Sequence, residues 1–262
     1  MQTPPFMITY SRLKVVNRLT AACVLTAPLV AYVFGMSWGL LFATLAIWQF
    51  LQVMGLVVGA HRYFSHRMFT TSRFWQWVMA VSCVGALTGP PCVWADLHIK
   101  HHKHADEDDD PYIDFIRTGV SPFSHENFKG NRMLLKMLAS DPMHGLTIKY
   151  YFLIVALLAA GLTSVGVLAG LDPLTALFWL YLVPGGMCHM TLRFVVWSGH
   201  VPGLGYRNHE TPDLSHNWWF VSLISGGEGW HNNHHHDQTA VNLREKWWEF
   251  DPAYWIIKVI RK

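Results

Sequence analysis

Cysteine and charged side chains are both scarce in this sequence, and each scarcity excludes a class of protein. The chain has only 4 cysteines in 262 residues, and they are scattered. Zinc sites built from thiolates and iron–sulfur clusters need several clustered cysteines, so neither is expected. Charged residues make up 14% of the chain, and no basic run stands out. Binding of nucleic acid is therefore not expected.

Charge is missing altogether from three long apolar stretches. The first runs from Leu19 to Ala60, and two more, 150–171 and 173–192, flank Asp172. A helix rises about 1.5 Å per residue and the hydrocarbon core is about 30 Å thick, so the first stretch is long enough for two crossings. Gly35, Ser37 and Gly39 mark a turn between them. We expect four transmembrane helices in two hairpins, at about residues 17–35, 38–60, 150–171 and 174–197.

Lysine and arginine are distributed unevenly around these spans. The two hairpin tips, near Gly35 and Asp172, have none, whereas the N-terminal segment and residues 61–149 and 198–262 contain many. Because positive charge favours the cytoplasmic side, we expect both termini, Gly119 and a cap made of residues 61–149 and 198–262 to lie in the cytoplasm. The expected location is a bacterial inner membrane, with residues 1–262 forming one domain.

One further apolar segment, from Phe74 to Trp94, is long enough to suggest a fifth span. Glycines and prolines interrupt it at Gly85, Gly89, Pro90 and Pro91. A crossing here would also separate the polar segments on either side of it. We therefore expect a buried or interfacial helix on the cytoplasmic side. The aromatic tail is expected to lie at the membrane surface as well, through Trp247, Trp248, Tyr254 and Trp255.

Histidines gather in three clusters just beyond the apolar stretches. The members are His61 and His66; His98, His101 and His102; and His231, His234 and His235. Histidines at i, i+3 and i+4 share a helical face, and a bend at a helix end could bring two that are five apart to one site. One such cluster is more typical of solvated histidines or a weak zinc site. Three clusters on one side of a membrane offer enough imidazoles for two metal ions, and the lack of clustered cysteine favours iron and oxygen chemistry.

The chain resembles the histidine-box membrane fatty acyl desaturases, which include stearoyl-CoA desaturase and the bacterial delta-9 acyl desaturases. The matching stretches are Gly59–His66, Phe69–Arg73, Trp94 with His98–His102 and Asp109–Pro111, and Gly227–His235. The resemblance extends from about residue 15 to the C-terminus. It implies an all-α integral membrane protein with four transmembrane helices and a cytoplasmic helical cap that holds a di-metal site.

The resemblance also implies a reaction. Two ferrous ions would activate O₂, and two hydrogens would leave an acyl chain to form a cis double bond of delta-9 type. Electrons would come from a ferredoxin or a cytochrome b5 type donor. The substrate would be an acyl-CoA, an acyl-ACP or an acyl-lipid. No catalytic residue is expected beyond the metal ligands.

A ninth ligand, His200, follows from the resemblance, since it occupies the position of a histidine at the cytoplasmic end of the fourth span. The expected metal ligands are therefore His61, His66, His98, His101, His102, His200, His231, His234 and His235. Family members often carry an asparagine four residues before this position, where this chain has Val196. A water-mediated contact to one metal is then missing, or is supplied by Asn217 or by the pair Asn232 and Asn233.

The remaining polar residues near the boxes have weaker assignments. His104 and His236 are expected just outside the ligands, although His101 with His104 is a rival pairing. Carboxylates commonly accept the second N–H of a ligand histidine, and the acidic residues near the boxes could do so or could form a solvated loop. These are Asp96, Asp106, Asp110, Glu228 and Asp237. We expect His125, His144, His209 and His216 on the polar surface, and His189 in a hydrogen bond inside the fourth span.

Three alternatives to desaturation stay open. An acyl hydroxylase or an alkene-forming decarboxylase would use similar boxes, and product analysis separates them. A non-catalytic metal-binding membrane protein would consume no O₂. Val183–Gly186 resembles the haem motif of cytochrome b5, but valine stands at the ligand position, so the electron donor is expected to be a separate protein.

Overall fold

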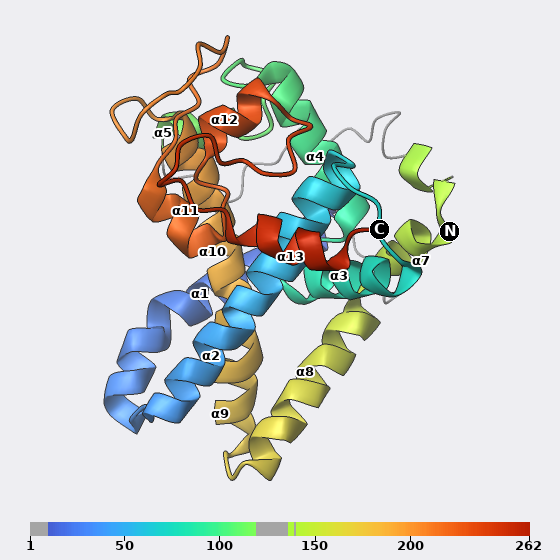
Figure 1. Cartoon of the computed structure of the whole chain (residues 1–262). Coiled ribbons are helices and arrows are strands. Elements are labelled where there is room, and N and C mark those ends of the chain that lie inside the picture. The colour runs from blue at the N-terminus through green and yellow to red at the C-terminus, as the bar shows by residue number, and fades with distance from the viewer. Residues whose placement is uncertain (1–9, 119–135, 139) are drawn as a thin grey trace.

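Helices joined by loops build the part of the chain that the structure describes, residues 10–118, 136–138 and 140–262. The structure is a computed structural model (Figure 1). Long helices occupy one half of the molecule, and short helices and loops form a cap over one end of these long helices (Figure 1). Gly119 and His125, for which we expect a cytoplasmic and a surface position, lie outside the described residues.

The first hairpin consists of α1 (Tyr10–Phe34) and α2 (Trp38–Phe50), and α2 continues without a break into the wider helix η1 (Leu51–Ser65). The turn lies where the sequence predicts it. Gly35 has a φ of 79°, which favours glycine, and the Ser37 hydroxyl accepts a hydrogen bond from the Leu40 amide at 3.1 Å.

The second hairpin consists of α8 (Tyr151–Leu168) and the continuous rod formed by α9 (Pro173–Leu177), η2 (Phe178–Leu182) and α10 (Val183–His200). Asp172 begins this rod, because its carboxylate accepts from the amides of Leu174 and Thr175, both at 3.0 Å. The predicted break at Asp172 is therefore confirmed.

Three helical stretches are long and apolar enough to cross a membrane: 15–34, 38–65 and 151–168. Many apolar side chains on these rods face outward; Leu25 is 72% exposed and Leu168 is 89% exposed. An apolar surface of this kind suits lipid rather than water. The rod that ends in α10 is not among the three, and α10 contains His189 and Arg193 as well as glycine.

The cap is made of short helices: α3 (Arg73–Gly85), α4 (Pro91–His104), α5 (Ile113–Thr118), α7 (Pro142–Lys149), α11 (Trp219–Ser225), α12 (His231–His236) and α13 (Pro252–Ile260). The single helix expected from Phe74 to Trp94 is in fact two, because Gly89 has a φ of 117° and Pro90 is extended. The second of these helices, α4, goes on to carry the middle histidine cluster.

Close packing of α3 on η1 fixes the base of the cap. A Cβ atom placed on Gly55 would lie 2.6 Å from the backbone of Ser82, so only glycine allows this approach. Around this contact, Val57, Met79 and Ile257 are almost completely buried and join η1, α3 and α13 in one apolar core. The C-terminal end of η1 is thus held rigidly where the first histidine cluster begins.

Candidate metal centre

The nine histidines predicted as ligands come together at the centre of the cap. They divide into two groups, in each of which the ring nitrogens lie within 4.8 Å of one another. We call them the five-histidine group and the four-histidine group. The first contains His61, His66, His98, His102 and His234, and the second contains His101, His200, His231 and His235.

His61 and His66 reach the same group because of the wide turn of η1. This helix has hydrogen bonds from residue i+5 to residue i, such as the one from the His66 amide to the His61 carbonyl at 3.1 Å. Residues five apart therefore lie nearly one above the other, and the two ring centroids are 5.0 Å apart. The expected bend at the helix end is replaced by this wide turn.

On α4 and α12 the i, i+4 pairs stay together, and the third histidine of each box goes to the other group. His98 and His102 belong to the five-histidine group, whereas their neighbour His101 belongs to the other. On α12 the pair is His231 and His235, in the four-histidine group, and His234 crosses to the five-histidine group. The boxes on α4 and α12 therefore each serve both groups, whereas His61 and His66 serve only the five-histidine group.

The spacing of the nitrogens suits ligands of a single ion in each group. In the five-histidine group, Nε2 of His61 lies 2.9 Å from Nε2 of His234, and Nε2 of His66 lies 2.8 Å from Nε2 of His98. With metal–nitrogen bonds of about 2.1 Å, ligands at right angles are about 3.0 Å apart and tetrahedral ligands about 3.4 Å apart. The observed distances correspond to right angles, which tetrahedral zinc does not favour.

Four carboxylates hold the outer nitrogen, Nδ1, of four of these histidines. His101 Nδ1 lies 2.8 Å from Asp110, His200 Nδ1 lies 3.1 Å from Asp106, and His61 Nδ1 contacts Glu228. His235 Nδ1 lies 2.8 Å from Asp213. A carboxylate in this position keeps the proton on Nδ1 and leaves the Nε2 lone pair free to bind a metal.

The inward nitrogens therefore fit a cation. His200 Nε2 lies 3.0 Å from His231 Nε2, although Asp106 holds the His200 proton on the other side of the ring. Within the described residues, the buried Nε2 atoms of His101 and His235 have no hydrogen-bond partner. Buried lone pairs that face one another are costly unless a positive ion lies between them.

Burial also keeps these rings neutral. The pKa of seven of the nine histidines lies below the ordinary value, mainly because burial disfavours the charged imidazolium. Neighbouring histidines lower it further, whereas Asp106 partly offsets the fall for His200 and Asp213 does so for His235. The pKa falls to about 2 for His66 and to about 4 for His235. The other five are His98, His102, His200, His231 and His234. Neutral rings at physiological pH are ready to bind metal.

A buried arginine supports the carboxylate behind His61. Arg62 is fully buried and donates to Asp251 Oδ2 at 2.8 Å and to Glu228 Oε1 at 3.3 Å. Glu228 thereby joins Arg62 to His61. Neither Arg62 nor Asp251 was expected in this role, because nothing in the sequence places residue 251 near residue 62.

Several other expectations need correction. His104 pairs with Glu107 near the surface and His236 stacks on His209, so the contacts seen for both are with residues other than the expected ligands. His144, expected at the surface, is only 6% exposed and packs against Phe64. Of the expected carboxylates, Asp237 caps a turn at Thr239 instead of holding a ligand histidine. Asp213 was missed, because it lies in a loop without any periodic pattern.

The asparagines considered as substitutes for the residue at Val196 have other roles. Asn217 Oδ1 accepts from the amides of Asn232 and Asn233, at 3.0 and 3.2 Å. Asn232 Oδ1 accepts from the backbone of Asn208 at 2.8 Å, and Asn233 Nδ2 donates to Leu243 at 2.8 Å. In these contacts the three amides fix α12 against the loops before and after it.

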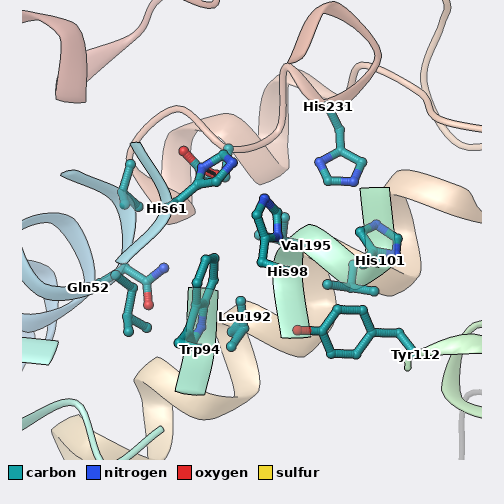
Figure 2. A pocket seen from close by; sticks show the side chains of 13 residues that line it. Gln52, His61, Trp94, His98, His101, Tyr112, Leu192, Val195 and His231 are labelled. Carbon is teal, nitrogen blue, oxygen red and sulfur yellow. Dashed lines mark ion pairs between the residues drawn. The ribbon is translucent and has the colours of Figure 1, made fainter. Parts of the chain in front are cut away.

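A narrow cavity of about 20 Å³ adjoins both histidine groups (Figure 2). His61 and His98 line it from one group, and His101 and His231 from the other. The rest of its wall is mostly apolar, and Val196 contributes to it. His189, as expected, makes a hydrogen bond within α10, with Arg193 Nε at 3.0 Å, and takes no part in either group.

Comparison with known proteins agrees with this geometry. The profile of the family described as fatty acid desaturase matches residues 36–259. The chain belongs to the fatty acid desaturase family. This match spans most of the chain and includes all nine histidines, so the protein is an enzyme, an oxidoreductase that acts on fatty acyl chains. Family membership and the apolar rods together indicate a membrane protein.

Individual desaturases resemble the chain at moderate identity. The sn-1 stearoyl-lipid 9-desaturase of Anabaena variabilis is 26% identical over 238 residues, 86% of this chain and 82% of that protein. The sn-2 palmitoyl-lipid 9-desaturase of Nostoc sp. (strain 36) is 29% identical over 232 residues, 82% of this chain and 75% of that protein. An acyl-CoA 5-desaturase of Anemone leveillei is 27% identical over 244 residues, 87% of this chain and 70% of that protein.

Proposed function

We propose that this desaturase contains two irons and inserts a cis double bond of delta-9 type. The observation that carries the proposal is the pair of histidine groups beside one narrow, mostly apolar cavity. Two of the relatives named above are 9-desaturases, which supports the bond position. In the balanced reaction, the acyl chain loses two hydrogen atoms, a donor supplies two electrons, the solvent supplies two protons, and O₂ becomes two waters.

All nine histidines would hold the metal, five at one ion and four at the other. The right-angle spacing of nitrogens, and a group of five nitrogens where tetrahedral zinc takes four ligands, support ferrous iron over zinc. Bound iron would supply the activation of O₂ that attack on an unactivated C–H bond requires. Asp106, Asp110 and Asp213 would keep three of the four rings in the smaller group oriented, and Glu228 would do the same for His61.

The cavity wall would position the chain and exclude water. Trp94 stacks on His98, with 4.8 Å between ring centroids, so it forms a flat apolar wall beside the nitrogens. Leu192, Val195 and Val196 contribute aliphatic surface from α10. A narrow path with such walls admits a thin extended chain and holds one pair of methylenes near the metals.

The proposed topology has four spans and one domain, residues 1–262. The three long apolar stretches and the rod that ends in α10 would cross the membrane, and the cap would lie in the cytoplasm of a bacterial cell. The electron donor would be a ferredoxin or a cytochrome b5 type protein. Relatives named for acyl-lipid and for acyl-CoA substrates support either carrier, and acyl-ACP is a third.

Expression in a host that lacks its own desaturase tests the function directly. Mass spectrometry of the lipids should locate one new cis double bond between carbons 9 and 10, and elemental analysis of the purified protein should find about two irons per chain. A hydroxylated product or a shortened chain would refute desaturation. Full activity with one metal per chain would refute the assignment of nine ligands.

A further inference from the structure

A second cavity, of about 40 Å³, lies beside the one at the metal site. Both cavities are lined by Trp94, Tyr112, Leu192 and Val196, so they lie next to each other and share part of their walls. The walls of the second cavity come mainly from α1, α4, α5 and α10. They carry polar groups that a hydrocarbon chain does not need: Asn17, Thr88, His189 and Arg193.

Arg193 is the charged member of this wall. It lies on α10 within the proposed fourth span, where a charged side chain is costly and usually marks a binding site. Its Nε donates to His189 Nε2 at 3.0 Å, and its guanidinium lies over the Phe115 ring, 5.2 Å from the centroid. These contacts hold the side chain in place at the cavity wall.

Two more polar groups point to an occupant that forms hydrogen bonds. Asn17 is only 7% exposed, and its Oδ1 has no hydrogen-bond partner within the described residues. The same holds for the buried Oγ1 of Thr88. Leaving a buried polar group unsatisfied costs about 1–3 kcal/mol. The carbonyl oxygen of an ester or thioester would accept a hydrogen bond from the Thr88 hydroxyl, whereas methylenes would not, and Asn17 Oδ1 would need a donor such as water or a hydroxyl.

We propose that Arg193 binds the carbonyl oxygen of the acyl ester or thioester and so fixes which carbons lie beside the metals. This inference rests on the proposed function. The cavity at the metal site would take the chain, and the second cavity its carbonyl end. Acyl-CoA, acyl-ACP and acyl-lipids all present this carbonyl.

The helix spacing agrees with a double bond in the middle of the chain. Arg193 and His200 are both on α10, separated by a rise of about 10.5 Å. An extended hydrocarbon chain advances about 1.25 Å per carbon, given bonds of about 1.5 Å in the staggered conformation, so this rise corresponds to about eight carbons. A carbonyl held at Arg193 would therefore place carbons near position 9 close to the histidines.

The test compares Arg193→Met and Arg193→Lys with wild type, each as full-length protein in detergent with reductant. The probes are stearoyl-coenzyme A and distearoyl-phosphatidylglycerol, assayed separately to identify the carrier. Arg193→Met should raise KM about tenfold or more, as expected for loss of a charge-assisted hydrogen bond, and should give a mixture of double-bond positions. Arg193→Lys should restore a single position. Arg117→Met removes a similar, exposed arginine that pairs with Asp108 and should behave like wild type.

A substrate change makes the test independent of protein folding. Wild-type protein should desaturate the di-octadecyl ether of phosphatidylglycerol, which lacks the carbonyls, at scattered positions. If the ether gave the same single position as the ester, or if Arg193→Met folded and kept that position, the proposal would be overturned. If wild type formed no double bond from any ester, the proposed function would fail instead.

Discussion

Gly199 leaves no room for a side chain beside His231, and its replacement by alanine tests the four-histidine group. A Cβ atom on this residue would lie 2.6 Å from His231 Cδ2 and 3.2 Å from its Nε2. Ordinary contacts begin near 3.4 Å, so the ring would have to move by 0.8 Å, the difference between 2.6 and 3.4 Å. Metal–ligand distances tolerate only about 0.2 Å.

The rings around His231 leave it little room to move away from the new methyl group. Its ring contacts those of His200 and His235, at 4.9 and 4.5 Å between centroids, and His231 is 4% exposed. We expect Gly199→Ala to weaken metal binding at the four-histidine group by about 10- to 100-fold or more, since mutation of an outer partner of a ligand already costs that much. The five-histidine group should keep its ion, since none of its members is among the atoms nearest to the new methyl group.

Mass-spectrometric metal analysis after dialysis against a chelator measures this effect. The iron content should fall from about two to about one per chain, with loss of turnover. Gly161→Ala is a matched control, because Gly161 is also helical and nothing lies within 4 Å of a Cβ there. A Gly199→Ala protein with two irons and wild-type turnover would refute the four-histidine group as a metal site.

Four further predictions follow from the site and its surroundings. His101→Ala should abolish desaturation of the acyl chain, whereas His104→Ala should leave its rate near normal. The reverse result would show that His104 is a ligand and that His101 is not. Asp213→Asn should lower metal affinity about 10- to 100-fold in a chelator competition, and unchanged affinity would contradict its role at His235. Burial lowers the pKa of seven histidines in the folded state, so below about pH 6.5 the unfolded chain binds protons that the folded chain does not. Metal-free protein should therefore lose up to about 1.4 kcal/mol of stability per histidine for each pH unit below this value, and a thermal midpoint equal at pH 7.5 and 5.5 would contradict it. Cysteines introduced at Ser37 and Asp172 should react with an impermeant reagent from outside the cell, and protection of both would overturn the topology.

Much of the fold could be predicted because lipid demands long charge-free runs. The hairpin turns at Ser37 and Asp172 were visible as interruptions in those runs, and both residues cap helices as their side chains allow. The division of the segment 74–94 into two helices was harder to predict. Gly89 and Pro90 were recognised as interruptions, but the course of the chain after them depends on tertiary packing, in which α4 contacts η1.

The candidate site was predictable as far as its residue types and spacings go. Helical periodicity placed the members of each box on one face, yet could not assign His101 and His102 to different groups. That depends on the angle at which α4 meets η1 and α12, which is a property of tertiary packing. Asp251 was invisible for the same reason, since Arg62 is 189 residues away in the sequence, and Asp213 was missed because its loop has no periodic pattern.

Because the histidines in each group come from distant parts of the chain, a metal bound by the proposed ligands would also act as a cross-link. His102 and His234, 132 residues apart, meet in the five-histidine group, as do His61 and His234, 173 residues apart. Closing a loop of this length costs roughly 4 kcal/mol of chain entropy. During synthesis, α12 is made after the other boxes, and until it arrives the groups have only four of five and two of four nitrogens. The supply of metal would thus govern how much of the newly made protein folds completely. Without metal, the cap would lack the bonds that join its early histidines to those of α12.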